Sequence, residues 1–198
     1  MWSHSVKIGL GKRWWILLGT AIPVLALLVL LVWASAKSGG NPGGLAVNSE
    51  LGEVSSSVDF ARDFSLELLN GQTLTLSELE GKIVMLDFWA SWCAPCRQEA
   101  SALANVYREF SGLPVEFIGV DIWDSREDAR RFVSQFDVPY PTGVDAKGTI
   151  AIDYGVRGIP EKFFISPDGA ILKKFTGPMN EDSLRTILDG LLAAMPSE

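Results

Sequence analysis

Residues 82–97 read Lys-Ile-Val-Met-Leu-Asp-Phe-Trp-Ala-Ser-Trp-Cys-Ala-Pro-Cys-Arg and predict a buried strand that leads into a helix. The part up to Ala90 is almost unbroken in apolar residues, which is typical of a strand covered on both faces of a parallel sheet. Beyond Cys93, apolar residues recur at helical spacing as far as Phe110, and Val115–Ile122 returns to strand character. This order predicts a βαβ unit.

The rest of the folded part predicts short elements on either side of that unit. They are a hairpin at 64–76, one helical turn opened by a capping box at Ser77–Glu80, a helix at 125–136, a hairpin at 163–175 around Pro167-Asp168-Gly169, and a last helix at 184–195 capped by Asn180. A βαβ half followed by a ββα half predicts an α/β thioredoxin-like fold, with a central mixed sheet flanked by helices.

The amino-terminal segment predicts export. Residues 14–33 are uncharged and mostly apolar, and as a helix they would span about 30 Å, the thickness of a bilayer core. Lys12-Arg13 just before them favour a cytoplasmic amino terminus at 1–13. Ala34-Ser35-Ala36 leaves open the alternative of a signal peptide cleaved there. Either interpretation places the folded part outside the cytoplasm.

A tether and one folded domain are expected after this segment. Residues 34–58 are rich in Gly and Ser and show no apolar periodicity, so they predict a flexible linker. The domain is predicted at 59–198, because 198 residues suffice for one domain and a targeting segment.

Charge and residue counts exclude several functions. The first 33 residues hold three basic residues and no acid, so the remainder carries 14 basic against 24 acidic residues. Such an acidic part argues against a nucleic-acid partner. Two cysteines and one histidine, His4, cannot supply four zinc ligands, and a Ser-His-Asp triad is excluded because His4 precedes the apolar run. We expect neither a metal nor a cofactor besides a redox-active disulfide.

The pair Cys93 and Cys96 predicts thiol-disulfide exchange. Both would lie in the first turn of the helix that follows the central strand, on one face and close enough to bridge. Unpaired N–H groups at a helix start stabilise a thiolate, so Cys93 is the expected nucleophile and Cys96 the resolving thiol. A structural disulfide is the alternative, although so short a loop stabilises little. Haem attachment is excluded because Arg97 stands where Cys-x-x-Cys-His needs histidine.

Two stretches carry a family resemblance. Asp87-Phe-Trp-Ala-Ser-Trp-Cys-Ala-Pro-Cys-Arg97 resembles the active-site strand and turn of thioredoxins. Gly155-Val-Arg-Gly-Ile-Pro-Glu-Lys-Phe163 is similar to the corresponding stretch of the membrane-anchored thioredoxin-like reductases of cytochrome c maturation, the CcmG and TlpA type. The likeness extends over residues 60–195.

The resemblance implies roles for further residues. Asp87 would assist deprotonation of Cys96, although the partner lysine of thioredoxins looks replaced by Gly119; an exposed strand-edge aspartate is the alternative. Pro160 would be the cis-proline after Ile159, whose backbone pairs with substrate. Glu161 would modulate proton transfer, or be a plain surface-strand glutamate. Trp92 would cover the disulfide or simply pack. Trp123 receives no role.

The resemblance also implies a function. We expect an oxidoreductase on the outer face of the membrane that reduces disulfides of exported proteins such as apocytochrome c before haem attachment, and that receives electrons from a membrane thiol transporter. A disulfide oxidase or isomerase remains open, because Ala94-Pro95 alone does not fix the redox potential. A peroxidase is disfavoured because Leu86 and Ala90 stand where peroxiredoxins have proline and a hydroxyl residue. A redox-inert binding module is disfavoured by the presence of both cysteines.

Overall fold

The computed structural model describes residues 11–37, 46–47, 52–54 and 60–195. The chain divides into two compact units, Met1–Gly44 and Leu45–Glu198. The first contains helix α1, Gly11–Lys37, with Pro23 inside it. Within the residues whose side chains the structure describes, no helix combines the length and apolar character needed to cross a membrane. The anchor at 14–33 therefore stays a prediction from sequence.

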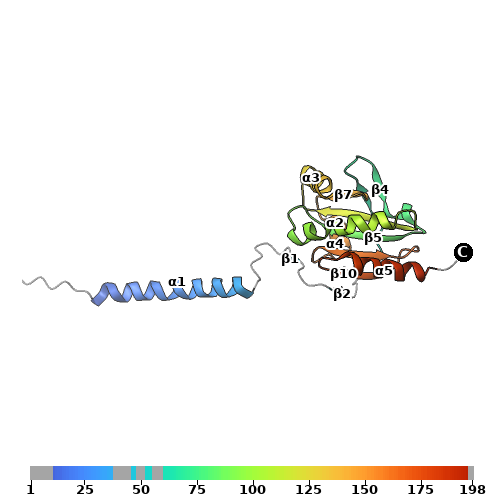
Figure 1. Ribbon diagram of the computed structural model, residues 1–198. Coiled ribbons are helices and arrows are strands. Elements are labelled where there is room, and N and C mark those ends of the chain that lie inside the picture. The colour runs from blue at the N-terminus through green and yellow to red at the C-terminus, as the bar shows by residue number, and fades with distance from the viewer. Residues whose placement is uncertain (1–10, 38–45, 48–51, 55–59, 196–198) are drawn as a thin grey trace, which may run out of the picture. The chain divides into compact units, whose positions relative to one another are not determined.

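The second unit is built on one six-stranded mixed sheet (Figure 1). Its strands, in spatial order, are β2 (Gly52–Val54), β10 (Ile171–Thr176), β9 (Glu161–Ile165), β5 (Ile83–Trp89), β6 (Val115–Ile122) and β7 (Thr142–Asp145). Strands β5, β6 and β7 are parallel, whereas β9 is antiparallel to β5 and β10 to β9. This is the predicted thioredoxin-like α/β fold.

Helices and two small sheets complete the unit. They are η1 (Leu76–Leu79), α2 (Ala94–Glu109), α3 (Arg126–Phe136), α4 (Thr149–Asp153) and α5 (Glu181–Ala193), with the pairs β3 (Ser65–Glu67) and β4 (Thr73–Thr75), and β1 (Ala46–Val47) and β8 (Gly158–Ile159). Helices α2 and α5 contact each other, and α3 contacts both α2 and β7. The predicted cap of the last helix is confirmed, since Asn180 accepts a hydrogen bond from the N–H of Ser183 at 2.8 Å.

Strand β5 is buried along its whole length because both faces of the sheet are covered. Phe88, for example, contacts the rings of Tyr154 and Phe163 at centroid distances of 5.8 and 5.6 Å. Truncating such a side chain to alanine typically costs about 3–5 kcal/mol. The strand therefore gives the residues after it, including Cys93, a rigid base.

Three local expectations differ from the structure. The capping box is opened by Thr75 rather than Ser77, since the Glu78 carboxylate accepts from the Thr75 N–H at 3.2 Å. Strand β7 follows the Pro139–Pro141 passage, where no strand was expected. Strands β1 and β2 lie within the predicted tether, where no strand was expected. They form because they pair with β8 and β10, and the Gly- and Ser-rich composition gives no sign of these partners.

Candidate functional site

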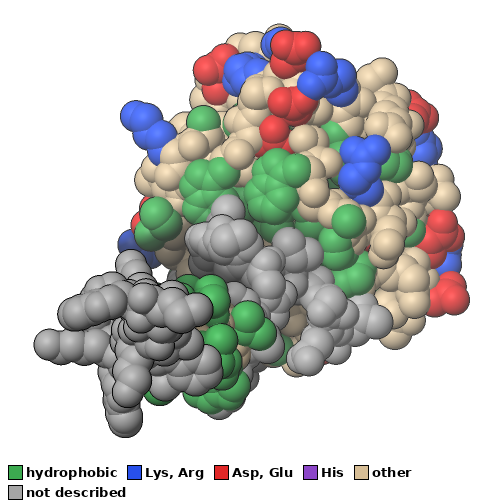
Figure 2. All heavy atoms as spheres, turned by 90° about the vertical axis from the view of Figure 1, so that its left-hand side faces the viewer, with side chains coloured by type: hydrophobic (Ala, Val, Ile, Leu, Met, Phe, Trp, Pro, Cys, Tyr) green, Lys and Arg blue, Asp and Glu red, His purple; other side chains and the backbone are tan. Residues whose placement is uncertain are grey.

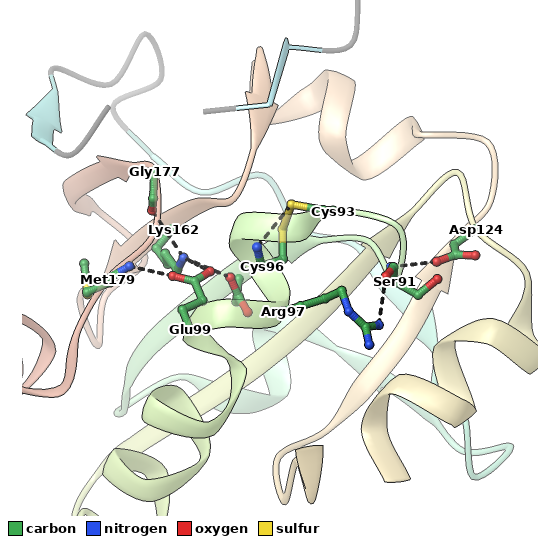
Figure 3. The surroundings of a disulfide bond; sticks show 10 residues. Ser91, Cys93, Cys96, Arg97, Glu99, Asp124, Lys162, Gly177 and Met179 are labelled. Carbon is green, nitrogen blue, oxygen red and sulfur yellow. Dashed lines mark hydrogen bonds and ion pairs between the residues drawn. A yellow bond between two sulfur atoms is a disulfide. The ribbon is translucent and has the colours of Figure 1, made fainter. Parts of the chain in front are cut away.

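Cys93 and Cys96 form a disulfide at the start of α2 (Figure 3). Their Cα atoms are 5.3 Å apart, as the three-residue spacing predicts. Cys93 is the N-cap of α2, with extended backbone angles, and its Sγ accepts a hydrogen bond from the Cys96 N–H at 3.3 Å. Pro95 suits the first helical turn because its missing N–H would have no partner there. In the reduced protein this N–H would stabilise a Cys93 thiolate.

Neither cysteine is exposed to solvent in this oxidised state. The exposed fraction of Cys93 is 0% and that of Cys96 is 2%. Cys93 lies where the fully buried β5 passes into α2, and its sulfur is bonded inward to Cys96. A client can therefore reach this sulfur only after a local movement.

The replacement expected at Gly119 is seen, but a lysine from the other neighbouring strand pairs with Asp87. Gly119 does lie opposite Asp87 on β6, but Lys162 lies opposite Asp87 on the other neighbour, β9. The Lys162 Nζ is 3.6 Å from Asp87 Oδ1, and both side chains are almost wholly buried. A Cβ on Gly119 would come within 2.7 Å of Thr142 Oγ1, so no side chain fits there. The strand-edge alternative for Asp87 is wrong, because β5 is central and Asp87 is 2% exposed.

Lys162 also pairs with Glu99, which makes a buried cluster of two acids and one base (Figure 3). The second oxygen of Glu99 accepts from the Met179 N–H at 2.6 Å. The hydroxyl of Tyr140 donates to Asp87 Oδ2 at 3.4 Å. One buried cation thus faces two carboxyl groups, which favours retention of a proton by the acids.

The pKa values of both acids are raised. Burial raises the pKa of Asp87, and Lys162 and Tyr140 only partly oppose it. Burial also raises the pKa of Glu99 to about 7, with Lys162 opposing and Asp87 adding to the rise. Glu99 therefore changes its charge near neutral pH, which is the range where a proton acceptor for a thiol is useful.

An open cavity of about 490 Å³ lies beside the cluster. Glu99 and Met179 line it, together with Gln98, Ala102 and Phe175. The carboxyl group of Glu99 is almost buried, but this cavity brings solvent near it. Glu99 is therefore the member of the cluster that lines this cavity.

The peptide bond between Ile159 and Pro160 is cis, as predicted. Both residues are buried, and Ile159 ends the short strand β8. Strand β1 pairs in parallel with β8, with Ala46 opposite Gly158 and Val47 opposite Ile159. The backbone edge that the resemblance assigns to substrate thus accepts an extended segment of the chain itself, while a role of this edge in substrate binding stays a prediction.

Glu161 is 1% exposed, so the alternative of a surface glutamate is wrong. Its Oε2 lies 2.8 Å from Lys174 Nζ, and its Oε1 accepts from the Arg157 N–H at 3.3 Å. These contacts tie β9 to β10 and to the loop before β8. The proposed role of Glu161 in proton transfer remains a prediction.

Two tryptophans beside the site are exposed. Trp92, which precedes Cys93, is 45% exposed, and Trp123 after β6 is 40% exposed. Figure 2 shows hydrophobic side chains gathered in the middle of one face, with acidic and basic side chains at its edges. An exposed Trp92 is available for contact with a client, and its role in covering the disulfide stays a prediction.

Sequence reasoning missed Glu99, Lys162 and Tyr140. Glu99 follows Cys96 by three residues and so lies on the same face of α2, which is the signal that could have identified it. Lys162 offered a second signal, because it directly precedes the apolar residues Phe163-Phe-Ile of the same strand. Nothing in the sequence places Tyr140 near Asp87. Within the described part of the chain, no group of three or more His, Cys, Asp or Glu side chains could hold a metal ion.

Comparisons with known proteins agree with this geometry. The model of the AhpC/TSA family matches residues 58–174. Thiol-disulfide oxidoreductase ResA of Bacillus subtilis is 34% identical over 129 residues, 65% of this chain and 72% of that protein. Thiol:disulfide interchange protein HelX of Rhodobacter capsulatus is 37% identical over 115 residues, 58% of this chain and 63% of that protein.

A solved structure shares the fold. It is that of a secreted Mycobacterium tuberculosis disulfide oxidoreductase homologous to DsbE of E. coli, with a TM-score of 0.57 and 29% sequence identity. The match covers 67% of this chain and 96% of that one.

Proposed function

Because this chain belongs to the AhpC/TSA family, we propose that it is a thiol-disulfide oxidoreductase that works through Cys93 and Cys96 outside the cytoplasm. One observation carries the proposal: Cys93 caps α2 with its sulfur facing the N–H of Cys96. A structural disulfide would need neither this helix start nor a buried acid cluster beside it. The names of the relatives point to the same chemistry.

The reaction begins from the reduced protein. The Cys93 thiolate attacks one sulfur of a client disulfide, and the other client sulfur leaves as a thiolate. Cys96 loses its proton and attacks Cys93 Sγ, which releases the second client sulfur and closes the Cys93–Cys96 disulfide. Two electrons thereby pass from this protein to the client.

The buried acids assist the second step. Cys96 must give up a proton in a place where water is scarce, and Asp87 and Glu99 are the carboxyl groups of the adjoining cluster. Raised pKa values allow them to accept a proton near neutral pH. Lys162 keeps both acids in the cluster and limits how far their pKa values rise.

The clients are exported proteins that carry disulfides, with apocytochrome c supported by the similarity of Gly155–Phe163 to the CcmG and TlpA type. Residues 14–33 anchor the chain in the membrane, unless cleavage after Ala36 releases it. Their apolar length supports the anchor. A membrane thiol transporter returns the electrons, a partner supported by the similarity of Gly155–Phe163 to the CcmG and TlpA type.

Reduction of insulin by dithiothreitol tests the activity. The wild-type chain should accelerate it, and Cys93→Ser should fall to the uncatalysed rate. Equal rates with and without the protein would refute the proposal. Equilibration with glutathione then decides the direction. A potential near about −120 mV would favour the disulfide oxidase, and a much more negative one the reductase.

A further inference from the structure

The backbone N–H and the backbone carbonyl of Ser91 each form a hydrogen bond with a side chain from elsewhere in the site (Figure 3). The Ser91 N–H donates to Asp124 Oδ2 at 2.8 Å. The Ser91 carbonyl accepts from Arg97 Nη1 at 3.3 Å. Ser91 lies two residues before Cys93, in the turn that connects β5 to α2. These two contacts therefore fix the turn that presents the nucleophile.

Arg97 is itself anchored on α3. Its Nη2 donates to Gln135 Oε1 at 3.1 Å, and its guanidinium lies 5.1 Å from the centre of the Phe136 ring. Asp124 comes from the loop that leads into the same helix. Both contacts thus tie the Ser91 turn to one neighbouring segment, 124–136.

The loop around Asp124 adopts an unfavourable backbone conformation that aims its carboxylate at Ser91. Trp123 has a φ of 51°, which non-glycine residues rarely adopt. Its indole lies against Gly148, where a Cβ would come within 2.6 Å of the indole nitrogen. The second oxygen of Asp124 accepts from the Ser125 N–H at 2.8 Å.

Asp121 lies behind this loop, at the end of β6. It is 0% exposed, and neither carboxyl oxygen accepts a hydrogen bond from a residue that the structure describes. Burial, together with the charges of Asp124 and Asp128, raises the pKa of Asp121 to about 9. At neutral pH it is uncharged, so it does not repel the Asp124 carboxylate from its place at Ser91.

We propose that Asp124 is a positioning residue for thiol-disulfide exchange, whose carboxylate fixes the Ser91 peptide and so keeps Cys93 Sγ at the start of α2. The proposal rests on the proposed function of Cys93. Helix N–H groups stabilise a thiolate only when the sulfur is held against them. A free turn lets the sulfur move away, and the pKa of Cys93 then rises toward the ordinary thiol value.

The loss of the Asp124 charge, taken by itself, shifts the Cys93 pKa in the opposite direction. Removing a negative charge near Cys93 makes a thiolate easier to form, so it lowers the thiol pKa. Two variants separate the effects. Asp124→Ala removes both charge and acceptor, whereas Asp124→Asn removes the charge but keeps an oxygen that can accept from the Ser91 N–H.

The experiment uses the reduced full-length chain and measures, over a pH series, the second-order rate of Cys93 alkylation by iodoacetamide. For Asp124→Ala we expect a higher Cys93 pKa and a rate at pH 7 that falls about tenfold, the factor for one charge-assisted hydrogen bond. For Asp124→Asn we expect a pKa at or below that of the wild type. Asp182→Ala is the matched control, because it removes an acid whose side chain is 94% exposed in the first turn of α5, a helix that supplies none of the contacts to the Ser91 turn given above.

Each outcome is decisive. Asp124→Ala with a wild-type or lowered pKa overturns the proposal, and so does Asp124→Asn with a raised one. Should Asp124→Ala not fold, as circular dichroism would show, Asp124→Leu is measured in its place and judged by the same criterion, because leucine keeps the bulk of the aspartate but has neither its charge nor its acceptor. An ordinary, slowly alkylated Cys93 in the wild type would instead refute the proposed function.

Discussion

Glu99→Gln should remove much of the pH dependence of stability between about pH 4.5 and 7. The pKa of Glu99 rises from 4.5 to about 7 in the folded protein, so the native state binds this proton more tightly than the unfolded chain. The free energy of unfolding contributed by Glu99 is therefore greatest at low pH and is lost as the pH rises toward 7. A shift of about 2.5 units corresponds to about 3 kcal/mol.

Glutamine carries no charge at any pH, and its one oxygen can accept from either the Met179 N–H or the Lys162 ammonium but not from both in the same way as the carboxylate. The lost contact lowers the stability of the variant by a similar amount at every pH, so it does not alter the pH dependence. Between about pH 4.5 and 7, the free energy of unfolding should therefore decrease by about 3 kcal/mol less in the variant than in the wild type. The pKa of Asp87 is also raised, so the stability of the variant should still decrease somewhat as the pH rises.

Urea denaturation of the oxidised protein at closely spaced pH values measures this directly. The disulfide removes both thiols from the titration, so the acids dominate the curve. Glu109→Gln is the control, because it makes the same change at the exposed end of the same helix. If the free energy of unfolding of Glu99→Gln depended on pH just as that of the wild type does, the raised pKa of Glu99 would be refuted.

Three other changes test the site. Asp87→Asn should slow the resolution of mixed disulfides near neutral pH several-fold, as quenched-flow analysis would show, and an unchanged rate would remove Asp87 as a proton acceptor. Cys96→Ser should accumulate mixed disulfides with clients, visible on non-reducing gels; their absence would contradict the assigned order of attack. Val47→Pro removes a backbone N–H from β1 and so weakens its pairing with β8 beside Ile159. If β1 competes with clients for this edge, insulin reduction should become faster in the variant. An equal rate would show that β1 does not compete.

The strands and helices around the cysteines were predictable because their patterns are strong. An apolar run such as 82–90 has few alternatives to a central strand, and the helix after Cys93 shows clear spacing. Strand β7 was missed because Pro139 and Pro141 suggest irregular structure, whereas the parallel edge of β6 supplies the partners. Local composition does not predict which distant segments pair as strands.

The cysteines, Asp87 and the cis bond before Pro160 were also predictable, since short motifs carry them. The buried cluster was not, because it depends on register. Lys162 meets Asp87 only through the alignment of β9 with β5, and Glu99 reaches Lys162 only because α2 covers that point of the sheet. The replacement at Gly119 was predicted, but the lysine that reaches Asp87 from β9 was not.

The ultraviolet absorbance of thiolates, followed through a pH titration of the reduced full-length chain, tests the central claim most directly. We predict one thiol with a pKa well below the ordinary value of about 8.5, lost in Cys93→Ser and retained in Cys96→Ser. If both thiols ionise at about 8.5 or above, the start of α2 does not activate Cys93, and the redox role assigned to it is wrong.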